Sequence, residues 1–246
     1  AAGEDGFGLL GADMPAGKVV YLCAEDQESV LHHRLHNMAQ FLRRCGETGE
    51  AFLTRVADNF HVLPVYGLGL TIEPRGDQWW ERSWWQAAEY CRGARLIIVD
   101  TLIRFSGGRS ENDNVEMAVM MNAVEETVAQ TGSSFLLLHH VGKAAARDGS
   151  AGENQTAVRG ASALTDNARW QANMQTMTPT EAAKRGIEST EERRSWVTWE
   201  PTKTNYGPAQ DTVWLRRGDH GVLVRDDPPE PEQNARGGRQ NGPGRF

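Results

Sequence analysis

The sequence predicts an α/β fold, in which a mostly parallel twisted sheet is flanked by helices and antiparallel strands are added at its C-terminal edge. Three observations favour this fold class. Short apolar runs occupy residues 18–23, 60–65, 95–100 and 134–139, and runs of this length are typical of strands buried on both faces. Segments with helical spacing lie between these runs. Four more strand patterns follow, close together and separated by turn residues.

The helical segments and the later strands can be placed in chain order. Leucines, histidines and arginines recur at helical spacing over 29–44, and apolar residues at i, i+3 and i+4, among them Val115 and Val119, predict a helix over 114–130. A further helix over 77–90 contains Trp79, Trp80, Trp84 and Trp85. These rings could stack on nucleic-acid bases, but their helical spacing favours packing in the core and at a subunit interface. The later strands are predicted at 168–174, 195–203, 212–216 and 221–224.

The composition is that of a water-soluble globular protein, with one sizeable domain in 246 residues. We expect a connector over 1–17, a core over 18–225 and a disordered tail over 226–246, where proline, glycine and charged residues dominate. The net charge of −7 argues against a surface that is basic all over, yet it allows DNA in a local basic channel.

The expected location is the cytoplasm. No apolar run approaches the roughly 20 residues of a membrane span, and no signal segment opens the chain. Three cysteines without close pairing predict neither a disulfide framework nor a zinc site, which fits a reducing compartment.

Two carboxylates are candidates for chemistry because each follows an apolar strand. Asp100 ends the run RLIIVD, and Glu25 follows KVVYLCA. Ligands of open α/β sheets bind at the carboxyl ends of the strands. If the two strands are neighbours, one carboxylate holds a metal ion and the other polarises a water for attack on phosphorus. Asp100 alone is a weak signal, and the alternative for Glu25 and Asp26 is the acidic start of a helix, which we assign to Asp26.

Two adjacent histidines end the run SFLLLHH, and the second is His140. One of them could contact a terminal phosphate and report its loss to the loop that follows; the alternative is a core histidine bonded to backbone. That loop, over 141–158, is too long for an idle connection. Its Lys143 and Arg147, with Arg159 just beyond, suit a flexible arm that grips a sugar-phosphate backbone, although the same composition suits a solvated loop.

Four cations have no partner nearby in the sequence: Arg34, Arg159, Arg169 and Lys203. In oligomeric nucleotide hydrolases, a cation from the neighbouring subunit stabilises the developing charge of the transition state. Each of the four could equally be a surface ion pair of little consequence.

Five strings occur in register and identify a family. They are AEDQESVLHHRL (24–35), RLIIVDTLIRF (95–105), LLLHHVGKAAA (136–146), RGASALTDNARWQ (159–171) and KTNYG (203–207). Together they resemble the plasmid RepA-type hexameric replicative DNA helicases, AAA-like ATPases of the RecA superfamily, over residues 17–224. The resemblance implies a RecA-like core in a homo-oligomeric, hexameric ring. Such a ring hydrolyses ATP with Mg²⁺ at its subunit interfaces and moves along single-stranded DNA.

The resemblance also implies a role for each matching residue. Glu25 matches the catalytic glutamate, and Asp100 matches the aspartate that holds Mg²⁺ directly or through water, with Thr101 beside the nucleotide. His140 matches the sensor of the γ-phosphate. The interfacial cations are Arg169, which matches the arginine finger, with Lys203 and Arg34 as further nucleotide contacts. The DNA-facing residues are Lys143, Arg147 and Arg159.

One motif of the family is missing, namely the Gly-rich phosphate loop that ends in Gly-Lys-Ser/Thr, the Walker A motif. Gly17-Lys18 has the wrong glycine spacing, lacks the Ser/Thr and precedes a strand, and Gly142-Lys143 has no suitable upstream glycine. We expect the loop and its strand to lie upstream of Ala1, so that this chain alone does not hydrolyse ATP and its parallel sheet has a gap. The alternatives are a degenerate paralogue, a RecA-like regulatory ATPase that assembles on DNA without unwinding it, and a non-catalytic DNA-binding or assembly subunit.

Overall fold

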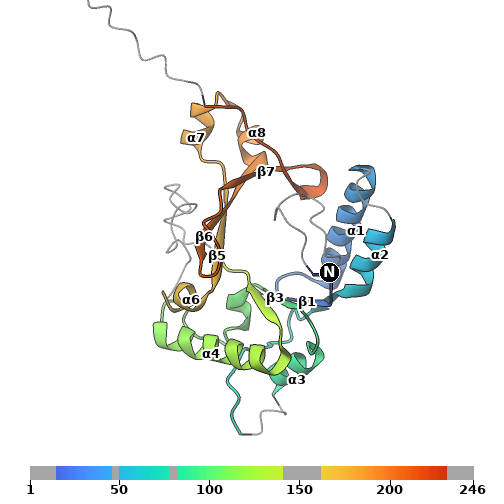
Figure 1. Cartoon of the computed structure of the whole chain (residues 1–246), viewed down its shortest axis with the longest axis vertical. Coiled ribbons are helices and arrows are strands. Elements are labelled where there is room, and N and C mark those ends of the chain that lie inside the picture. The colour runs from blue at the N-terminus through green and yellow to red at the C-terminus, as the bar shows by residue number, and fades with distance from the viewer. Residues whose placement is uncertain (1–14, 46–49, 78–81, 141–161, 232–246) are drawn as a thin grey trace, which may run out of the picture.

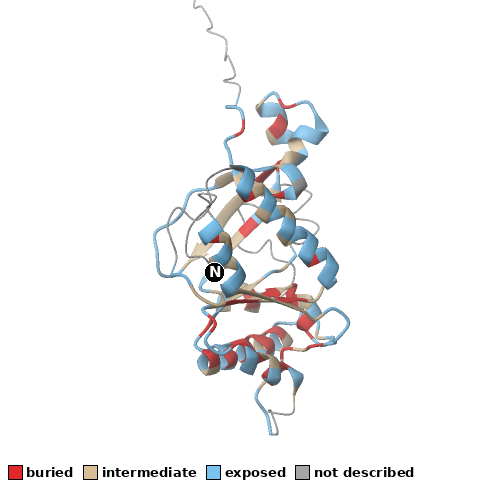
Figure 2. Cartoon of the chain, turned by 90° about the vertical axis from the view of Figure 1, so that its right-hand side faces the viewer, coloured by how far each residue is buried: buried red, intermediate tan, exposed pale blue. Residues whose placement is uncertain are grey.

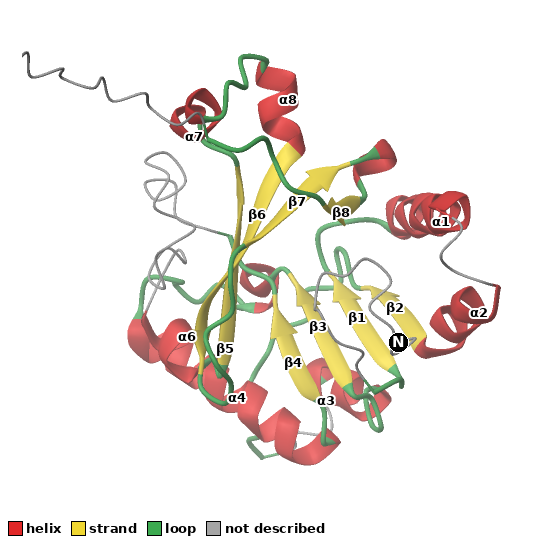
Figure 3. Cartoon of the chain, turned by 45° about the horizontal axis from the view of Figure 1, so that its top comes forward, coloured by secondary structure: helices red, strands yellow, loops and turns green. Residues whose placement is uncertain are grey.

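The computed structural model describes residues 15–45, 50–77, 82–140 and 162–231 (Figure 1). Its first layer is a parallel sheet in the strand order β2-β1-β3-β4, seen side by side in Figure 3. The strands are β1 (Val19–Cys23), β2 (Phe60–Pro64), β3 (Leu96–Asp100) and β4 (Ser134–Leu137). All three pairings are parallel, which confirms the predicted fold class.

The four strands of this parallel sheet are contiguous, so the expected gap does not lie among them, and the sheet is not joined to the antiparallel strands. β1 pairs with β2 on one side and with β3 on the other, and β3 pairs directly with β4. The hydrogen bonds between β3 and β4 continue beyond the last paired strand residues. The N–H of Leu102 donates to the carbonyl of Leu138 at 2.8 Å, and the N–H of Leu138 donates to the carbonyl of Val99 at 3.0 Å. Each described strand therefore finds a hydrogen-bonded neighbour without an additional strand between them.

Two helices follow β1 and precede β2, namely α1 (Glu28–Cys45) and α2 (Glu50–Asn59). Two more lie between β2 and β4, α3 (Ser83–Tyr90) and α4 (Asn114–Thr131). α4 begins at the N-cap Asp113, whose carboxylate accepts from two backbone N–H groups of the first turn, and it ends at Gly132 in the left-handed conformation (φ 71°). The helices predicted at 29–44 and 114–130 are confirmed, whereas α3 begins later than 77.

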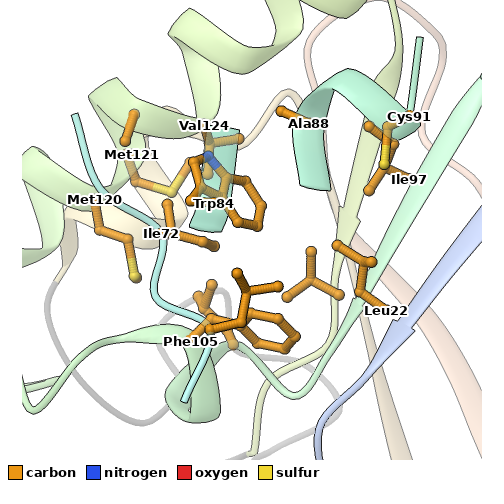
Figure 4. Packing of buried hydrophobic residues seen from close by; sticks show 14 of the residues in the cluster. Leu22, Ile72, Trp84, Ala88, Cys91, Ile97, Phe105, Met120, Met121 and Val124 are labelled. Atoms are coloured by element: carbon orange, nitrogen blue, oxygen red, sulfur yellow. The ribbon is translucent and has the colours of Figure 1, made fainter. Parts of the chain in front are cut away.

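The main core lies between the parallel sheet and helices α3 and α4 (Figure 4). Trp84 and Trp85 are each 1% exposed, so packing, not base stacking, is confirmed for these two tryptophans. Trp79 and Trp80 lie outside the described residues. α4 presents its methionines and Val124 to the core, while Val115 and Val119 are exposed, because the buried stripe is set by Met117, Met120 and Met121.

The antiparallel strands form a second sheet in the order β5-β6-β7-β8. They are β5 (Trp170–Thr176), β6 (Trp196–Thr204), β7 (Val213–Arg217) and β8 (Leu223–Arg225). The predicted antiparallel strands are present, but they pair only with one another, because β6 has β5 on one side and β7 on the other, and β8 pairs with β7.

Short helices complete the molecule. They are α6 (Ser162–Asn167), α7 (Pro179–Lys184) and α8 (Thr190–Ser195), with 3-10 turns at Leu102–Phe105 and Asp219–Gly221. Burial concentrates around the parallel sheet (Figure 2). A small separate cluster consists of Met177, Ala182, Ile187 and Trp196, of which Ala182 belongs to α7. Within the described ranges, no helix is both long and apolar enough to cross a membrane.

Candidate functional site

The candidate site lies at the carboxyl ends of β1, β3 and β4, which we call the carboxyl edge. β1 and β3 are neighbours, and the Cα register pairs Cys23 with Asp100. The N–H of Ala24 donates to the carbonyl of Asp100 at 2.7 Å, so the two chains stay together beyond the last ladder pair. The adjacency that the sequence prediction required is therefore confirmed, and Glu25 follows β1 at the point where Thr101 follows β3.

The carboxylate of Glu25 is the centre of this edge. Its Oε1 atom accepts a hydrogen bond from the Thr101 hydroxyl at 3.0 Å, and the Nε2 atom of His140 lies 3.5 Å from the same oxygen. Arg104 also approaches, with Nε at 3.9 Å. The Glu25 side chain is 33% exposed, so it stays open to solvent. Helix α1 begins only at Glu28, so Glu25 is not part of its first turn.

Asp100 is half-buried and points to a different partner. Its Oδ2 atom accepts a hydrogen bond from the Tyr21 hydroxyl, and the Cys23 thiol lies 4.0 Å from the same oxygen. Burial is the main reason why the pKa of Tyr21 lies far above its ordinary value. The hydrogen bond to Asp100 and the negative charge of that carboxylate raise this pKa further. The tyrosine therefore stays protonated and remains a donor. A cis peptide bond joins Asp100 to Thr101.

The oxygen atoms at the carboxyl edge fit Mg²⁺. Glu25, Asp100 and Thr101 supply two carboxylates and a hydroxyl, whereas no group of three or more His, Cys, Asp or Glu able to hold a metal occurs in the part of the chain that the structure describes. Mg²⁺ normally keeps several waters and is held by one or two carboxylates together with substrate phosphates, not by a complete protein cage. The donor set therefore suits Mg²⁺ held together with substrate phosphates.

The predicted cations lie elsewhere. Arg34 forms an ion pair with Asp26, next to the start of its own helix. Lys203 donates to the carbonyls of Thr165 and Asp166 at 2.7 and 3.0 Å, near the end of α6. Arg169 is exposed, and its guanidinium makes no hydrogen bond or ion pair with any residue of the described ranges.

Thus the fold brings Glu25, Thr101 and His140 together next to Asp100. Among the described residues, no hydrogen bond or ion pair joins these four side chains to Arg34, Arg169 or Lys203. The roles of the three cations stay predictions. The three residues predicted to bind DNA, Lys143, Arg147 and Arg159, lie outside the described residues.

Sequence reasoning missed two residues of the site, Tyr21 and Arg104. Tyr21 precedes Cys23 by two residues, so the period of two along a strand places both on one face, but a tyrosine in an apolar run is normally assigned to packing. Arg104 lies four residues after Asp100 inside the string that identified the family. Its approach to Glu25 depends on the turn at 102–105, which has no strong sequence signal.

Comparison with known proteins agrees with this architecture. The model of the AAA domain family matches residues 1–146, more than half of the chain, and the chain belongs to that family. Its fold is RecA-like and resembles that of a DnaB-like replicative helicase whose structure was described with its interactions with primase. That match has a TM-score of 0.55 at 13% identity, and covers 85% of this chain and 50% of the helicase chain.

A second match is the RadB recombinase, with a TM-score of 0.46 at 15% identity, covering 92% of this chain and 86% of that one. The present chain spans half the length of the helicase chain that it matches. At 13% identity, the likeness to the helicase chain concerns the fold.

Proposed function

We propose that the chain is the core of an ATP-dependent DNA helicase or translocase of the RepA type, acting in plasmid or phage DNA replication in the cytoplasm. One observation carries the proposal: the Glu25 carboxylate meets the Thr101 hydroxyl at 3.0 Å and the His140 imidazole at 3.5 Å, on the strand next to the one that ends in Asp100. Membership of the AAA domain family and the fold shared with a replicative helicase support it.

The residues of the carboxyl edge have complementary tasks. Glu25 accepts the proton of an attacking water, and the bond from Thr101 fixes one carboxylate oxygen so that the other is available as the base. Asp100 would hold Mg²⁺ together with the phosphates of ATP, and the bound ion would supply positive charge near the transferring phosphate. His140, which lies close to Glu25 and directly precedes residues 141–158 in the sequence, senses the terminal phosphate.

The second half of the site comes from a neighbouring subunit. Arg169 is exposed and forms no ion pair within the described part of the chain, as expected of a finger that reaches another molecule. Lys203 adds positive charge to the nucleotide site. Arg34 does the same when its ion pair with Asp26 is broken. The assembly is a homohexameric ring, in which Lys143, Arg147 and Arg159 face single-stranded DNA.

The test is ATP hydrolysis with and without single-stranded DNA. Because the sequence has no Gly-Lys-Ser/Thr loop, the assay uses this chain and also the longest product of the gene that encodes it. We expect DNA-stimulated hydrolysis by the longer product. Glu25→Gln should lower the rate by about 10²- to 10⁴-fold. Arg169→Ala should lower it by about 10³- to 10⁵-fold. Arg194→Ala, at another exposed arginine, is the matched control and should have no effect.

Mixing the two inactive variants tests the shared site. A ring that contains both Glu25→Gln and Arg169→Ala subunits has some interfaces with an intact Glu25 and an intact Arg169, so activity should partly return. A rate of ATP hydrolysis that is the same in wild type and in both variants would contradict the proposal. Hydrolysis without strand displacement would leave a regulatory ATPase, and no nucleotide hydrolysis by either product would leave a binding or assembly subunit.

A further inference from the structure

The Tyr21 hydroxyl is directed at the carboxylate of Asp100 by the geometry of two neighbouring strands. In the parallel register, Tyr21 lies opposite Ile98 and Cys23 lies opposite Asp100. Residues two apart on a strand share a face, so Tyr21, Cys23, Ile98 and Asp100 lie on the same face of the sheet. The tyrosine side chain spans the remaining separation and donates to Oδ2 of Asp100.

Both partners are held in place. β1 is hydrogen-bonded on both sides, by β2 and by β3, and the Tyr21 ring is stacked on that of Phe60 with centroids 6.0 Å apart and planes inclined by 28°. The backbone of Asp100 is fixed by the bond from the N–H of Ala24. The hydroxyl therefore occupies a fixed position and does not need to be ordered when a ligand arrives.

The two oxygens of Asp100 have different surroundings. Oδ2 has the tyrosine hydroxyl, and the Cys23 thiol at 4.0 Å is at most a weak donor. Oδ1 accepts no hydrogen bond from any residue within the described ranges. A carboxylate with one oxygen occupied and the other available is oriented to bind a cation, or a water of that cation, through a single oxygen.

We propose that Tyr21 is a positioning residue that holds Asp100 for Mg²⁺, an inference that rests on the metal role of Asp100 in the proposed function. The tyrosine does not touch the metal. It fixes the rotation of the carboxylate and supplies the hydrogen bond that ligating carboxylates usually receive from a second layer of residues. Loss of such a partner typically lowers metal affinity by about 10- to 100-fold.

The experiment is direct titration of this chain and of the longest product of its gene with Mn²⁺, with and without ADP, followed by the electron paramagnetic resonance signal of Mn²⁺ and with Mg²⁺ as competitor. Tyr21→Phe keeps the ring and its contact with Phe60 but removes the hydroxyl, and should weaken Mn²⁺ binding by about 10- to 100-fold. Asp100→Asn should abolish the Asp100-dependent binding. Tyr90→Phe is the matched control, because its exposed hydroxyl makes no hydrogen bond within the described residues, and should bind as wild type does.

Phe60→Leu adds a second variant, which keeps the hydroxyl and loosens only its support, so its loss of affinity should be smaller than that of Tyr21→Phe. Far-ultraviolet circular dichroism reports whether each variant is folded. If Asp100→Asn loses Mn²⁺ while Tyr21→Phe binds it as wild type does, the positioning role is overturned and the proposed function stands. If wild type shows no binding that depends on Asp100, the metal role in the proposed function fails as well.

Discussion

Thr127→Val should destabilise the protein by removing the acceptor of a buried indole N–H group. Thr127 is fully buried on α4; its hydroxyl donates to the carbonyl of Ala123 at 2.7 Å and accepts from the indole N–H of Trp84 at 3.0 Å. Valine has nearly the same shape, so no cavity forms, but the indole N–H loses its acceptor in the core. Leaving a buried donor unpaired costs about 1–3 kcal/mol. For a chain of this size, that corresponds to a fall in Tm of roughly 2 to 12 °C.

The assay is urea unfolding followed by circular dichroism, because tryptophan fluorescence changes with the partner variant. Thr54→Val is the matched control: Thr54 also donates to the carbonyl four residues earlier, but it is exposed, so its substitution should change the free energy of unfolding by less than about 0.5 kcal/mol. Trp84→Phe in both backgrounds completes a double-mutant cycle, and it should cost less in the Thr127→Val background than in the wild type. Equal costs for Thr127→Val and Thr54→Val, with no coupling in the cycle, would refute the reasoning.

Two further predictions concern the same domain. Gly107→Ala should cost more than about 2 kcal/mol in urea unfolding, because Gly107 has φ +64° and a Cβ would lie 2.4 Å from Cγ2 of Thr71. Gly67→Ala (φ +77°, nothing within 4 Å) should cost only the backbone strain of about 1–2 kcal/mol, and an equal cost at both sites would contradict the steric argument. Burial raises the pKa of the Cys91 thiol from 9.0 to about 11, so its contribution to stability is complete below pH 9 and is lost as pH rises through 11. The stability difference between wild type and Cys91→Ala should therefore shrink between pH 8 and pH 11, whereas a constant difference would show that Cys91 does not titrate with unfolding.

The elements that the sequence predicted well have a local signature. The strands ending at Cys23 and Asp100 are continuous apolar runs, and α4 combines a helical period with an Asp cap and a terminal glycine. Val115 and Val119 were predicted on the buried face of this helix but are exposed. Apolar residues occur on all sides of the helix, so a period of 3.6 does not show which side faces the core.

The candidate site divides in the same way. Glu25 and Asp100 could be located from the sequence because each follows an apolar strand, and strand ends gather at one edge of a parallel sheet. Tyr21 could not be distinguished from a packing residue, because the carboxylate it meets is far away in the sequence. Lys203 shows the opposite case: an isolated cation in sequence, it caps the carbonyl groups of Thr165 and Asp166 in the folded chain.

By itself, the sequence determined the α/β class, the order of the strands, the helices α1 and α4, and the placement of acidic side chains at the ends of β1 and β3, since these follow from periodicity and from the chemistry of neighbouring residues. It did not predict α2, α6, α7 or α8. Only the tertiary structure decided that β1 lies between β2 and β3, that the antiparallel strands form their own sheet, and that Tyr21 and Arg104 meet Asp100 and Glu25. The physical reason is range: strand neighbours and side-chain partners depend on contacts between distant segments, whose energies are set by packing and not by any local pattern.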